Sequence, residues 1–290
     1  MNDTLRIDSF EAQAVPLGAK DRNLLHELTV GVFWPHRAAD LDQLMAVGEG
    51  YLSLDEIGRP VGSAMRFPAG DDFAMLGMMV TPPRLQARGG GRFLLRRIIE
   101  DCDGRDLRLN ATRSGYRLYQ EAGFERVRTV FQHQGHLRTV PEVEVDPQIE
   151  IVEITPEHHA AVHELDRAAF GADRRPVIDA LLGVSTGIIA MRAGQPCGYA
   201  LVRRFGMGQV LGPLVASSEK MASQIAAPLM RQFEGRFLRV DTPAEGDVLT
   251  SFLTASGLPR FDTVTEMRMG LNRRPTEGVM TYGLAAHSLG

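Results

Sequence analysis

Apolar positions follow two spacings along this chain, and together they predict a protein of mixed α/β class. Short apolar runs that end at glycine, proline or acidic residues are typical of strands, whereas apolar residues three and four positions apart are typical of helices. In the first half these spacings predict strands at 50–55, 61–67, 73–80, 107–111 and 124–133. They predict helices at 21–30, 90–102 and 114–122.

The second half repeats this order of elements. Helices are expected at 156–169, 218–233 and 246–256, and strands at 187–192, 198–203, 209–215, 236–241 and 263–270. Each half therefore has antiparallel strands followed by strand–helix–strand–helix–strand. This order predicts an α+β mixed sheet with helices on both faces, and it favours a tandem duplication whose halves have diverged.

The segment 137–148 divides the two halves. It has two prolines among alternating acidic and apolar residues, which suits an extended connector better than a helix. We therefore expect a first domain at 1–136, a linker at 137–148 and a second domain at 149–290. The residues 282–290 are apolar enough to dock rather than to float free.

Composition narrows the class of protein further. A chain of 290 residues is long enough for two domains, and its apolar fraction of 44% and charged fraction of 23% are close to globular averages. A net charge of -4 offers no basic excess for nucleic acid, and two cysteines give no disulfide framework. No run suits a signal peptide or a membrane span, so we expect a cytoplasmic protein without a membrane partner. We also expect a monomer or homodimer without a nucleic-acid partner.

The most informative segment is the turn between the third strand and the second helix of the first half. Three consecutive glycines, Gly89, Gly90 and Gly91, come directly before that helix, and Arg88 and Arg92 flank them. Such a turn exposes backbone N–H groups at a positive helix N-terminus, which suits a pyrophosphate. A glycine-rich turn that only reverses the chain is the alternative. Neither G-x-G-x-x-G nor a Gly-Lys-Ser/Thr ending is present, so dinucleotide and P-loop sites are disfavoured.

Two motifs in this half are similar to those of a known family. Gln86-Ala87-Arg88-Gly89-Gly90-Gly91 resembles the phosphate motif Q/R-x-x-G-x-G/A of the GNAT superfamily of acyl-CoA-dependent N-acyltransferases. Leu109-Asn110-Ala111-Thr112 and then 115–124 resemble the pattern "L-x-A-T … G-x-x-L-Y-x-x-x-G-F" of many members. The resemblance covers residues 20–136. It implies a sheet that splays between two central strands, with the pantetheine arm of the co-substrate acetyl-CoA in the split.

The resemblance also implies which residues contact the cofactor. The pantetheine would lie along the strand at 73–80, where a backbone N–H would stabilise the oxyanion formed when an amine attacks the thioester. The same residues would equally suit a buried core strand. The implied cofactor contacts are Met78, Met79, Val80, Gln86, Ala87, Arg88, Gly89, Gly90, Gly91, Arg92 and Tyr119.

Tyr119 is the candidate catalytic residue. By its place in the second motif it would be the general acid that protonates the departing thiolate, because a tyrosine pKa of about 10 and a thiol pKa of about 8.5 are close. The alternative is a tyrosine that packs its helix against the sheet. Tyr116, one helical turn earlier, is the competing position.

The acceptor site and a general base are less well defined. The cofactor-contacting strand has no acidic residue, although many relatives use a glutamate there or nearby. Family members build the acceptor site after the first helix, where this chain has Trp34, His36 and Arg37. Asp173 lies in a charged segment that could hold a substrate or could end a helix with salt bridges, and His133 is a further candidate base. No metal is expected, because the histidines lack an H-E-x-x-H pattern.

The second half lacks the phosphate motif. Glu219 stands where the pyrophosphate charge would lie, and no tyrosine follows at the acid position. We therefore expect the second domain to be a degenerate GNAT-like repeat that does not bind CoA. Its expected roles are to cover the acceptor pocket and to select the substrate.

These observations lead to one functional expectation with two alternatives. We expect an acetyl-CoA-dependent N-acetyltransferase that transfers acetyl by direct attack to an amine of a small molecule or of an aminoacyl acceptor. Transfer of a longer acyl group, or of acetyl to oxygen, is one alternative. A non-catalytic protein that binds or senses acyl-CoA is the other: the glycine turn and Tyr119 argue against it, and the missing acid on the cofactor strand argues for it.

Overall fold

The structure is a computed structural model that describes residues 4–7, 10–86, 88–270 and 278–290 of the chain. It divides into two compact units. Unit 1 consists of Met1–Arg126 with Met267–Leu271, and unit 2 consists of Val127–Glu266 with Asn272–Gly290. Among the described residues, no helix combines the length and the apolar character needed to cross a bilayer.

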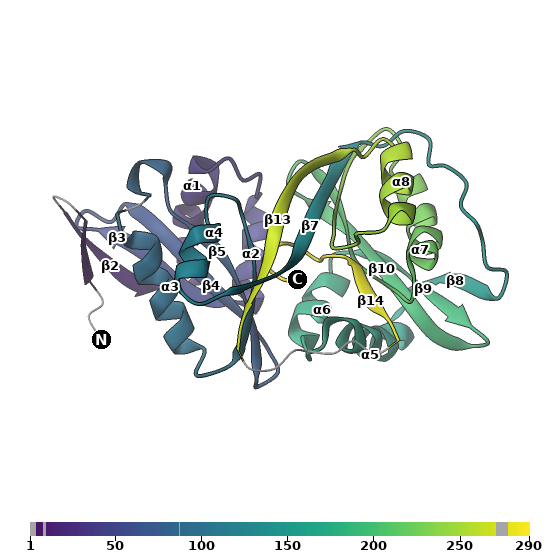
Figure 1. Cartoon of the computed structure of the whole chain (residues 1–290), viewed down its shortest axis with the longest axis horizontal. Coiled ribbons are helices and arrows are strands. Elements are labelled where there is room, and N and C mark those ends of the chain that lie inside the picture. The colour runs from purple at the N-terminus through teal and green to yellow at the C-terminus, as the bar shows by residue number, and fades with distance from the viewer. Residues whose placement is uncertain (1–3, 8–9, 87, 271–277) are drawn as a thin grey trace. The chain divides into compact units, whose positions relative to one another are not determined.

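Unit 1 is a mixed sheet with helices on both of its faces (Figure 1). Neighbouring strands are antiparallel from β1 to β5, whereas β5 and β6 are parallel. The strands, in sheet order, are β1 (Thr4–Ile7), β2 (Phe10–Pro16), β3 (Glu49–Asp55), β4 (Pro60–Ala69), β5 (Phe73–Val80), β6 (Asp106–Ala111) and the last residues of β13 (Arg260–Met269). The helices are α1 (Arg22–Gly31), α2 (Ala38–Val47), α3 (Gly90–Asp101) and α4 (Tyr116–Glu121), with short 3₁₀ helices η1 (Ala19–Asp21) and η2 (Pro83–Leu85).

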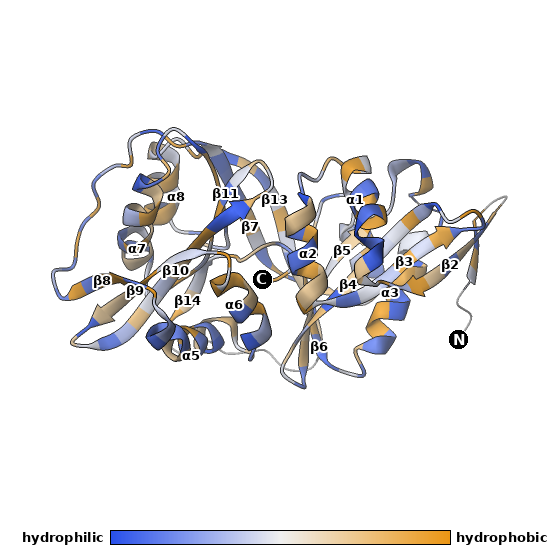
Figure 2. Cartoon of the chain, turned by 180° about the vertical axis from the view of Figure 1, so that it is seen from behind, coloured by the Kyte–Doolittle hydropathy of each residue, from blue (hydrophilic) through white to orange (hydrophobic). Residues whose placement is uncertain are grey.

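The core of unit 1 lies between the central strands and α3. β5 is apolar and mostly buried along its length, as expected for a strand covered on both faces. On α3, Leu94, Leu95 and Ile98 follow helical spacing and pack against Leu76 and Leu109 of the sheet. In Figure 2 the helices show both hydrophilic (blue) and hydrophobic (orange) stretches, as expected for helices that cover a sheet. This packing sets the first turn of α3 close beyond the end of β5.

Unit 2 repeats this arrangement, again with helices on both faces of its sheet. A cluster that includes Leu214, Ile225 and Phe252 joins the sheet to α7 and α8. The strands, in sheet order, are β13 (Arg260–Met269), β7 (Glu125–His136), β12 (Phe237–Thr242), β11 (Gly208–Ala216), β10 (Gln195–Phe205), β9 (Thr186–Arg192) and β8 (Ile149–Glu153), and β14 (Met280–Gly283) pairs with β11. The helices are α5 (His159–Phe170), α6 (Arg175–Leu182), α7 (Glu219–Arg231) and α8 (Asp247–Ala255), with the 3₁₀ helix η3 (Pro156–His158).

The structure confirms the mixed α/β fold, and it adds elements that the apolar pattern did not predict. These are β1, β2, α2, β8, α6 and β14. Most of them are short, so their periodicity is weak. The strand expected at 124–133 extends to His136 and pairs with β12. The division into units falls inside this strand, between Arg126 and Val127. Residues 137–148 contain no helix or strand, as a connector requires, and the domain limits placed there stay a prediction.

His133 lies on β7 in unit 2, and its side chain has no exposed surface. Its Nδ1 is 2.9 Å from the carbonyl oxygen of Leu258, and its Nε2 is buried without a hydrogen-bond partner in the described part of the chain. Burial lowers the pKa of His133, because a charged ring would lose its hydration without gaining a second partner. This environment supports a packed neutral histidine rather than the base for which the sequence made it a candidate.

We expect His133 to make the folded state less stable in acid. Because its pKa is lowered on folding, its contribution is present above the ordinary histidine pKa of about 6.5 and is lost as the pH falls through the folded value. His133→Gln should therefore flatten the change in thermal midpoint between about pH 7.5 and 5. The half-buried His26 offers a control, and His26→Gln should leave that change intact. The same pH dependence in both variants would contradict this account.

Candidate cofactor-binding site

Strand β5 contains a bulge at Met78. On β4, Ser63 and Met65 face Val80 and Gly77, so β5 has one extra residue between these two pairs. Met78 takes a φ of 49°, a left-handed conformation that is uncommon for any residue with a side chain. The buried Ser63 hydroxyl donates a hydrogen bond of 2.7 Å to the Met78 carbonyl oxygen. The neighbouring strand thus holds the bulge in place.

Strands β5 and β6 separate just before this bulge. Their parallel pairing runs from Phe73 with Asp106 to Leu76 with Leu109. β5 continues to Val80, and in the described part of the chain its residues after Leu76 have no partner on β6. An open strand edge of this kind can hydrogen-bond an extended ligand in the way that it would bond an added strand.

The first turn of α3 presents backbone N–H groups with no side chain in front of them. Gly89 precedes the helix in a left-handed conformation (φ 91°), and a Cβ placed there would meet nothing within 4 Å. No described side chain caps this end, so its first amides stay available. Position 91 favours glycine for a different reason. A Cβ at Gly91 would lie 3.3 Å from the Leu118 side chain. This helix end suits an anion such as a diphosphate.

Basic side chains surround this helix end. Arg88 and Arg92 are exposed, and Arg92 forms an ion pair with Glu121 of α4. Glu121 also accepts a hydrogen bond of 2.8 Å from Arg117, and this bond lowers the pKa of Glu121. The carboxylate is therefore ionised and shared by two arginines, which leaves the surroundings of the helix end positive.

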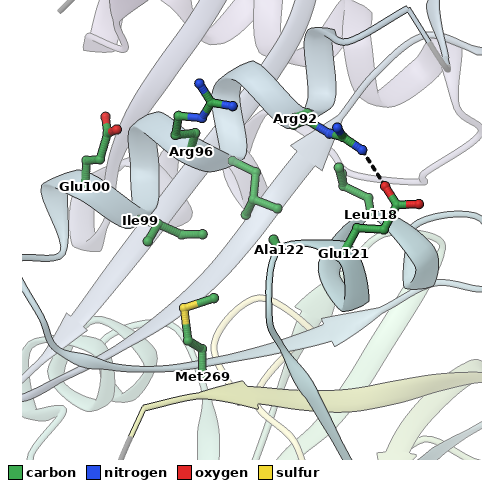
Figure 3. A pocket seen from close by; sticks show the side chains of 9 residues that line it. Arg92, Arg96, Ile99, Glu100, Leu118, Glu121, Ala122 and Met269 are labelled. Carbon is green, nitrogen blue, oxygen red and sulfur yellow. Dashed lines mark hydrogen bonds and ion pairs between the residues drawn. The ribbon is translucent and has the colours of Figure 1, made fainter.

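A groove of about 640 Å³ runs between α3 and α4 (Figure 3). Apolar side chains form much of its wall, and Figure 3 shows Arg92 directed at Glu121, with Arg96 one turn further along α3. An apolar wall beside cations suits a ligand with both a flat ring and a phosphate. The lining residues are Arg92, Leu95, Arg96, Ile99, Glu100, Leu118, Glu121, Ala122 and Met269.

Tyr119 is packed in the core of unit 1. Its side chain is 7% exposed, and its ring meets that of Phe124 edge-on with 6.0 Å between centroids. A Cβ at Gly115 would lie 3.1 Å from the Tyr119 ring, so the glycine makes room for it. Burial raises the pKa of Tyr119, and the hydroxyl therefore stays protonated at neutral pH. Tyr119 is therefore a packed core residue, as the alternative expected. Its hydroxyl can still donate a hydrogen bond, but it does not readily ionise.

The loop between α1 and α2 keeps its three candidate residues together. The rings of Trp34 and His36 have centroids 5.8 Å apart, and both side chains are half-buried. Arg37 precedes α2, where the Asp40 carboxylate accepts its backbone N–H at 2.8 Å and its Nε–H at 3.1 Å. This helix cap engages the guanidinium that the sequence assigned to a substrate.

The remaining candidates have local partners. The Gln86 side-chain amide donates a hydrogen bond of 3.2 Å to the Thr81 carbonyl oxygen, across the turn. Ala87 lies outside the described residues. Asp173 belongs to unit 2, where its carboxylate accepts the Arg175 N–H at 3.0 Å at the start of α6. Among the residues described, no group of three or more His, Cys, Asp or Glu side chains could hold a metal ion.

Two residues of this site were not predicted from the sequence. Ser63 lies in an apolar strand, and its role depends on a bulge that no local pattern marks. Arg96 follows Arg92 by one helical turn, and this spacing was the signal that could have found it.

Comparisons with known proteins bear on the fold and on unit 2. Residues 162–283 match the family model described as the acetyltransferase (GNAT) domain. The uncharacterized N-acetyltransferase YitH of Bacillus subtilis (strain 168) is 28% identical over 221 residues, which cover 74% of this chain and 76% of that protein. A candidate acetyltransferase from Pyrococcus horikoshii has a TM-score of 0.79 at 21% identity, with 100% of this chain and 99% of that chain covered. A tandem GNAT protein from the clavulanic acid biosynthesis pathway has a TM-score of 0.62 at 19% identity, covering 90% and 100%.

Residues 162–283 are thus similar to a GNAT acetyltransferase domain, and the matches support an acyltransferase. The fold of the chain matches GNAT structures, tandem GNAT proteins among them. The family model matches a range that begins in α5 and ends with β14, whereas the glycine motif lies in unit 1. The comparisons therefore confirm the expected tandem GNAT fold, while the family match itself lies within residues 162–283.

We expect Gly89→Glu to abolish the binding of CoA thioesters. A carboxylate in front of the first amides of α3 would repel phosphates and occupy their place. Gly104→Glu is a matched control, because Gly104 also has a positive φ (75°) and open space around it but follows the other end of α3. Isothermal titration should detect no binding in the first variant and unchanged affinity in the second. Equal affinities would remove the phosphate assignment.

Proposed function

We propose that this chain is an acetyl-CoA-dependent N-acetyltransferase, that unit 1 binds the acetyl-CoA, and that the acceptor is an amine of a small molecule or of an aminoacyl group. One observation carries the proposal: the open edge of β5 beyond Leu76 leads to the uncapped first turn of α3. A ligand with an extended amide-bearing arm and a diphosphate fits both features at once, and CoA is such a ligand.

The groove between α3 and α4 is our candidate for the nucleotide end of CoA. Its apolar wall suits an adenine ring, and its basic rim suits a phosphate. Arg92 is engaged with Glu121, whereas Arg96 forms no ion pair among the described residues. We therefore assign the 3′-phosphate of CoA to Arg96.

The proposed reaction is direct attack on the thioester. The amine nitrogen adds to the carbonyl carbon, and a backbone N–H of β5 near Met78 donates a hydrogen bond to the oxyanion. When the intermediate collapses, the new C–N bond remains and the C–S bond breaks. A preorganised donor of this kind accelerates acyl transfer by about 10²–10³. The nitrogen releases one proton to solvent, and the sulfur takes up one.

The raised pKa of Tyr119 changes the role proposed for its hydroxyl. Full proton transfer to a thiolate, whose conjugate thiol has an ordinary pKa of about 8.5, is unfavourable from a buried tyrosine of raised pKa. A hydrogen bond from the hydroxyl to the departing sulfur needs no such transfer and still stabilises the thiolate. Tyr119 is therefore proposed as a donor to the leaving group, with solvent as the final source of the proton.

The acceptor side of the proposal rests on Trp34 and His36. An aromatic ring beside an imidazole suits an amine-bearing acceptor, because the ring attracts cations and a neutral imidazole accepts a proton. Arg37 remains a proposed contact, although it also caps α2. Asp173, in unit 2, stays a prediction from the sequence and engages in a local cap at α6. β5 has no acidic residue, so this strand supplies no base.

Thiol release from acetyl-CoA with a broad panel of amines tests the proposal. Release that requires an amine supports the transferase. Binding of CoA without release across the panel would instead identify an acyl-CoA sensor. The same assay with propionyl-CoA and butyryl-CoA tests the alternative of a longer acyl group, which faster turnover of the longer thioester would favour.

Tyr119→Phe should lower turnover by about a hundredfold and leave CoA affinity unchanged, because the lost hydroxyl acts only when the sulfur departs. Tyr116→Phe, one turn earlier on the same helix, should keep the normal rate. Thiol release gives the rate and isothermal titration gives the affinity. A normal rate in Tyr119→Phe would reject the leaving-group role.

Arg96→Ala should weaken CoA by about two- to fivefold, the range of an exposed ion pair, and should leave 3′-dephospho-CoA unaffected. Only CoA has the phosphate that the guanidinium would contact. Glu100→Gln removes a charge from the same groove and should not weaken CoA. Equal losses for both ligands in Arg96→Ala would move the 3′-phosphate elsewhere.

A further inference from the structure

Unit 2 has the same split in its sheet as unit 1, but a strand of the chain itself fills it. The parallel pairing of β11 with β12 consists of Gln209 with Leu238 and Val210 with Arg239. Beyond these pairs β14 lies antiparallel against β11, drawn in yellow in Figure 1. The edge of β11 therefore corresponds to the open edge of β5, and here it is occupied.

The segment 280–290 binds both sides of this split through its main chain. Against β11, Val215 is paired with Thr281. Against β12, the Leu284 N–H donates a hydrogen bond of 2.8 Å to the Asp241 carbonyl oxygen. Close approach also requires a glycine, because a Cβ at Gly212 would lie 1.9 Å from the Leu284 carbonyl oxygen. The split is thus shaped to a peptide backbone.

Two buried arginines bind main-chain oxygens of the same segment. Arg203 donates to the Ala285 carbonyl oxygen at 2.7 Å and to that of Gly212 at 3.2 Å. Arg174 donates to the main-chain oxygens of Leu289 at 2.6 Å and Gly290 at 2.8 Å. Arg203 and Arg174 are only 4% and 2% exposed. Buried guanidinium groups need hydrogen-bond acceptors, and the segment supplies them to these two arginines of unit 2.

Arg174 is held in place by hydrogen bonds to a buried carboxylate. Asp166 accepts two hydrogen bonds of 2.8 Å from Arg174, one at each carboxylate oxygen. The hydroxyl of Tyr199 donates to the same carboxylate at 2.6 Å. The guanidinium therefore keeps one edge on Asp166 and presents Nη1 to the segment 280–290.

A side chain forms a further contact between the segment and β12. The Nε2 of His287 is 3.4 Å from a carboxylate oxygen of Asp241, which also pairs with Arg239 at 2.8 Å. Asp241 is only 1% exposed, so His287 and Arg239 both contact a buried carboxylate. The segment is therefore held through its backbone and through the His287 side chain.

The helix end in unit 2 does not suit a diphosphate. The Ser218 hydroxyl oxygen accepts the Met221 N–H at 3.2 Å and caps α7. Glu219, the first residue of α7, points its carboxylate at α8, where it accepts the Leu249 N–H at 2.9 Å. A hydroxyl cap and an acid replace the bare amides and the arginines of unit 1. The site accordingly favours a peptide over CoA.

We propose that the split between β11 and β12 is a peptide-binding site occupied by the chain's own residues 280–290, and that this occupant prevents unit 2 from taking up acyl-CoA. The ligand class is an extended peptide that pairs with β11 and offers main-chain oxygens to Arg174 and Arg203. The inference depends on contacts within unit 2 and stands apart from the function proposed for unit 1.

A cleavable version of the full chain tests this proposal. A protease site replaces residues 272–276, and the cut protein is then mixed with a fluorescent peptide of residues 278–290. We expect the cut segment to stay bound through gel filtration and to exchange slowly with the added peptide. Saturating CoA should not displace it. Release of the segment from a folded protein upon cleavage would overturn the proposal, and so would its replacement by a second CoA.

Variants of the added peptide avoid any effect on folding. In competition with the natural peptide, Gly283→Ala should bind at least tenfold more weakly, because its Cβ would lie 3.0 Å from the Leu214 side chain. Met280→Ala changes an exposed side chain (46%) and should compete normally. Equal competition by both peptides would show that the split does not fit closely around the main chain of the peptide, and it would contradict the proposal.

A variant of the protein gives an independent measurement. In the cut chain, Gly212→Ala should release the segment at least tenfold faster, whereas Gly183→Ala, whose Cβ would have no neighbour closer than 3.6 Å, should not. Equal release rates would overturn the proposal. CoA titration of the same samples separates the two proposals: a retained segment with no CoA bound at all would support this one and reject the function assigned to unit 1.

Discussion

Two parallel strands that pair briefly and then separate are the feature on which the rest of this structure depends. Backbone N–H and C=O groups inside a fold need partners, so a strand edge that opens within a sheet requires an occupant. In unit 1 the edge opens after Leu76 and is followed by the uncapped first turn of α3. The acetyl-CoA proposed for this unit would satisfy the strand edge and the helix end together.

Unit 2 meets the same requirement with its own chain. Its split holds β14, and its helix end is closed by Ser218, while the bare Gly89 leaves the corresponding end of unit 1 open. The difference between an open and a filled site thus comes from one added strand and from a few residues at equivalent points of one fold. In a chain with two such units, this asymmetry restricts the cofactor to one of them under our proposals.

Packing and chemistry are not separable in unit 1. The burial that places Tyr119 in the core also raises its pKa, and this favours hydrogen-bond donation over proton transfer. The Ser63 hydroxyl that satisfies a buried carbonyl also holds the bulge that follows the last pair of β5 with β6. Residues that look structural by their burial therefore set the geometry of the proposed reaction.

The sequence by itself determined the mixed fold, the glycine turn before α3 and the place of Tyr119, because periodicity and backbone freedom are properties of a few consecutive residues. Only the tertiary structure decided the bulge at Met78, which depends on the register with β4. It also decided the partner of Arg174, an oxygen 116 positions further along the chain in a segment that the sequence marked only as apolar. Strand register and the partners of buried charges join residues that are distant in sequence, and no local pattern records them.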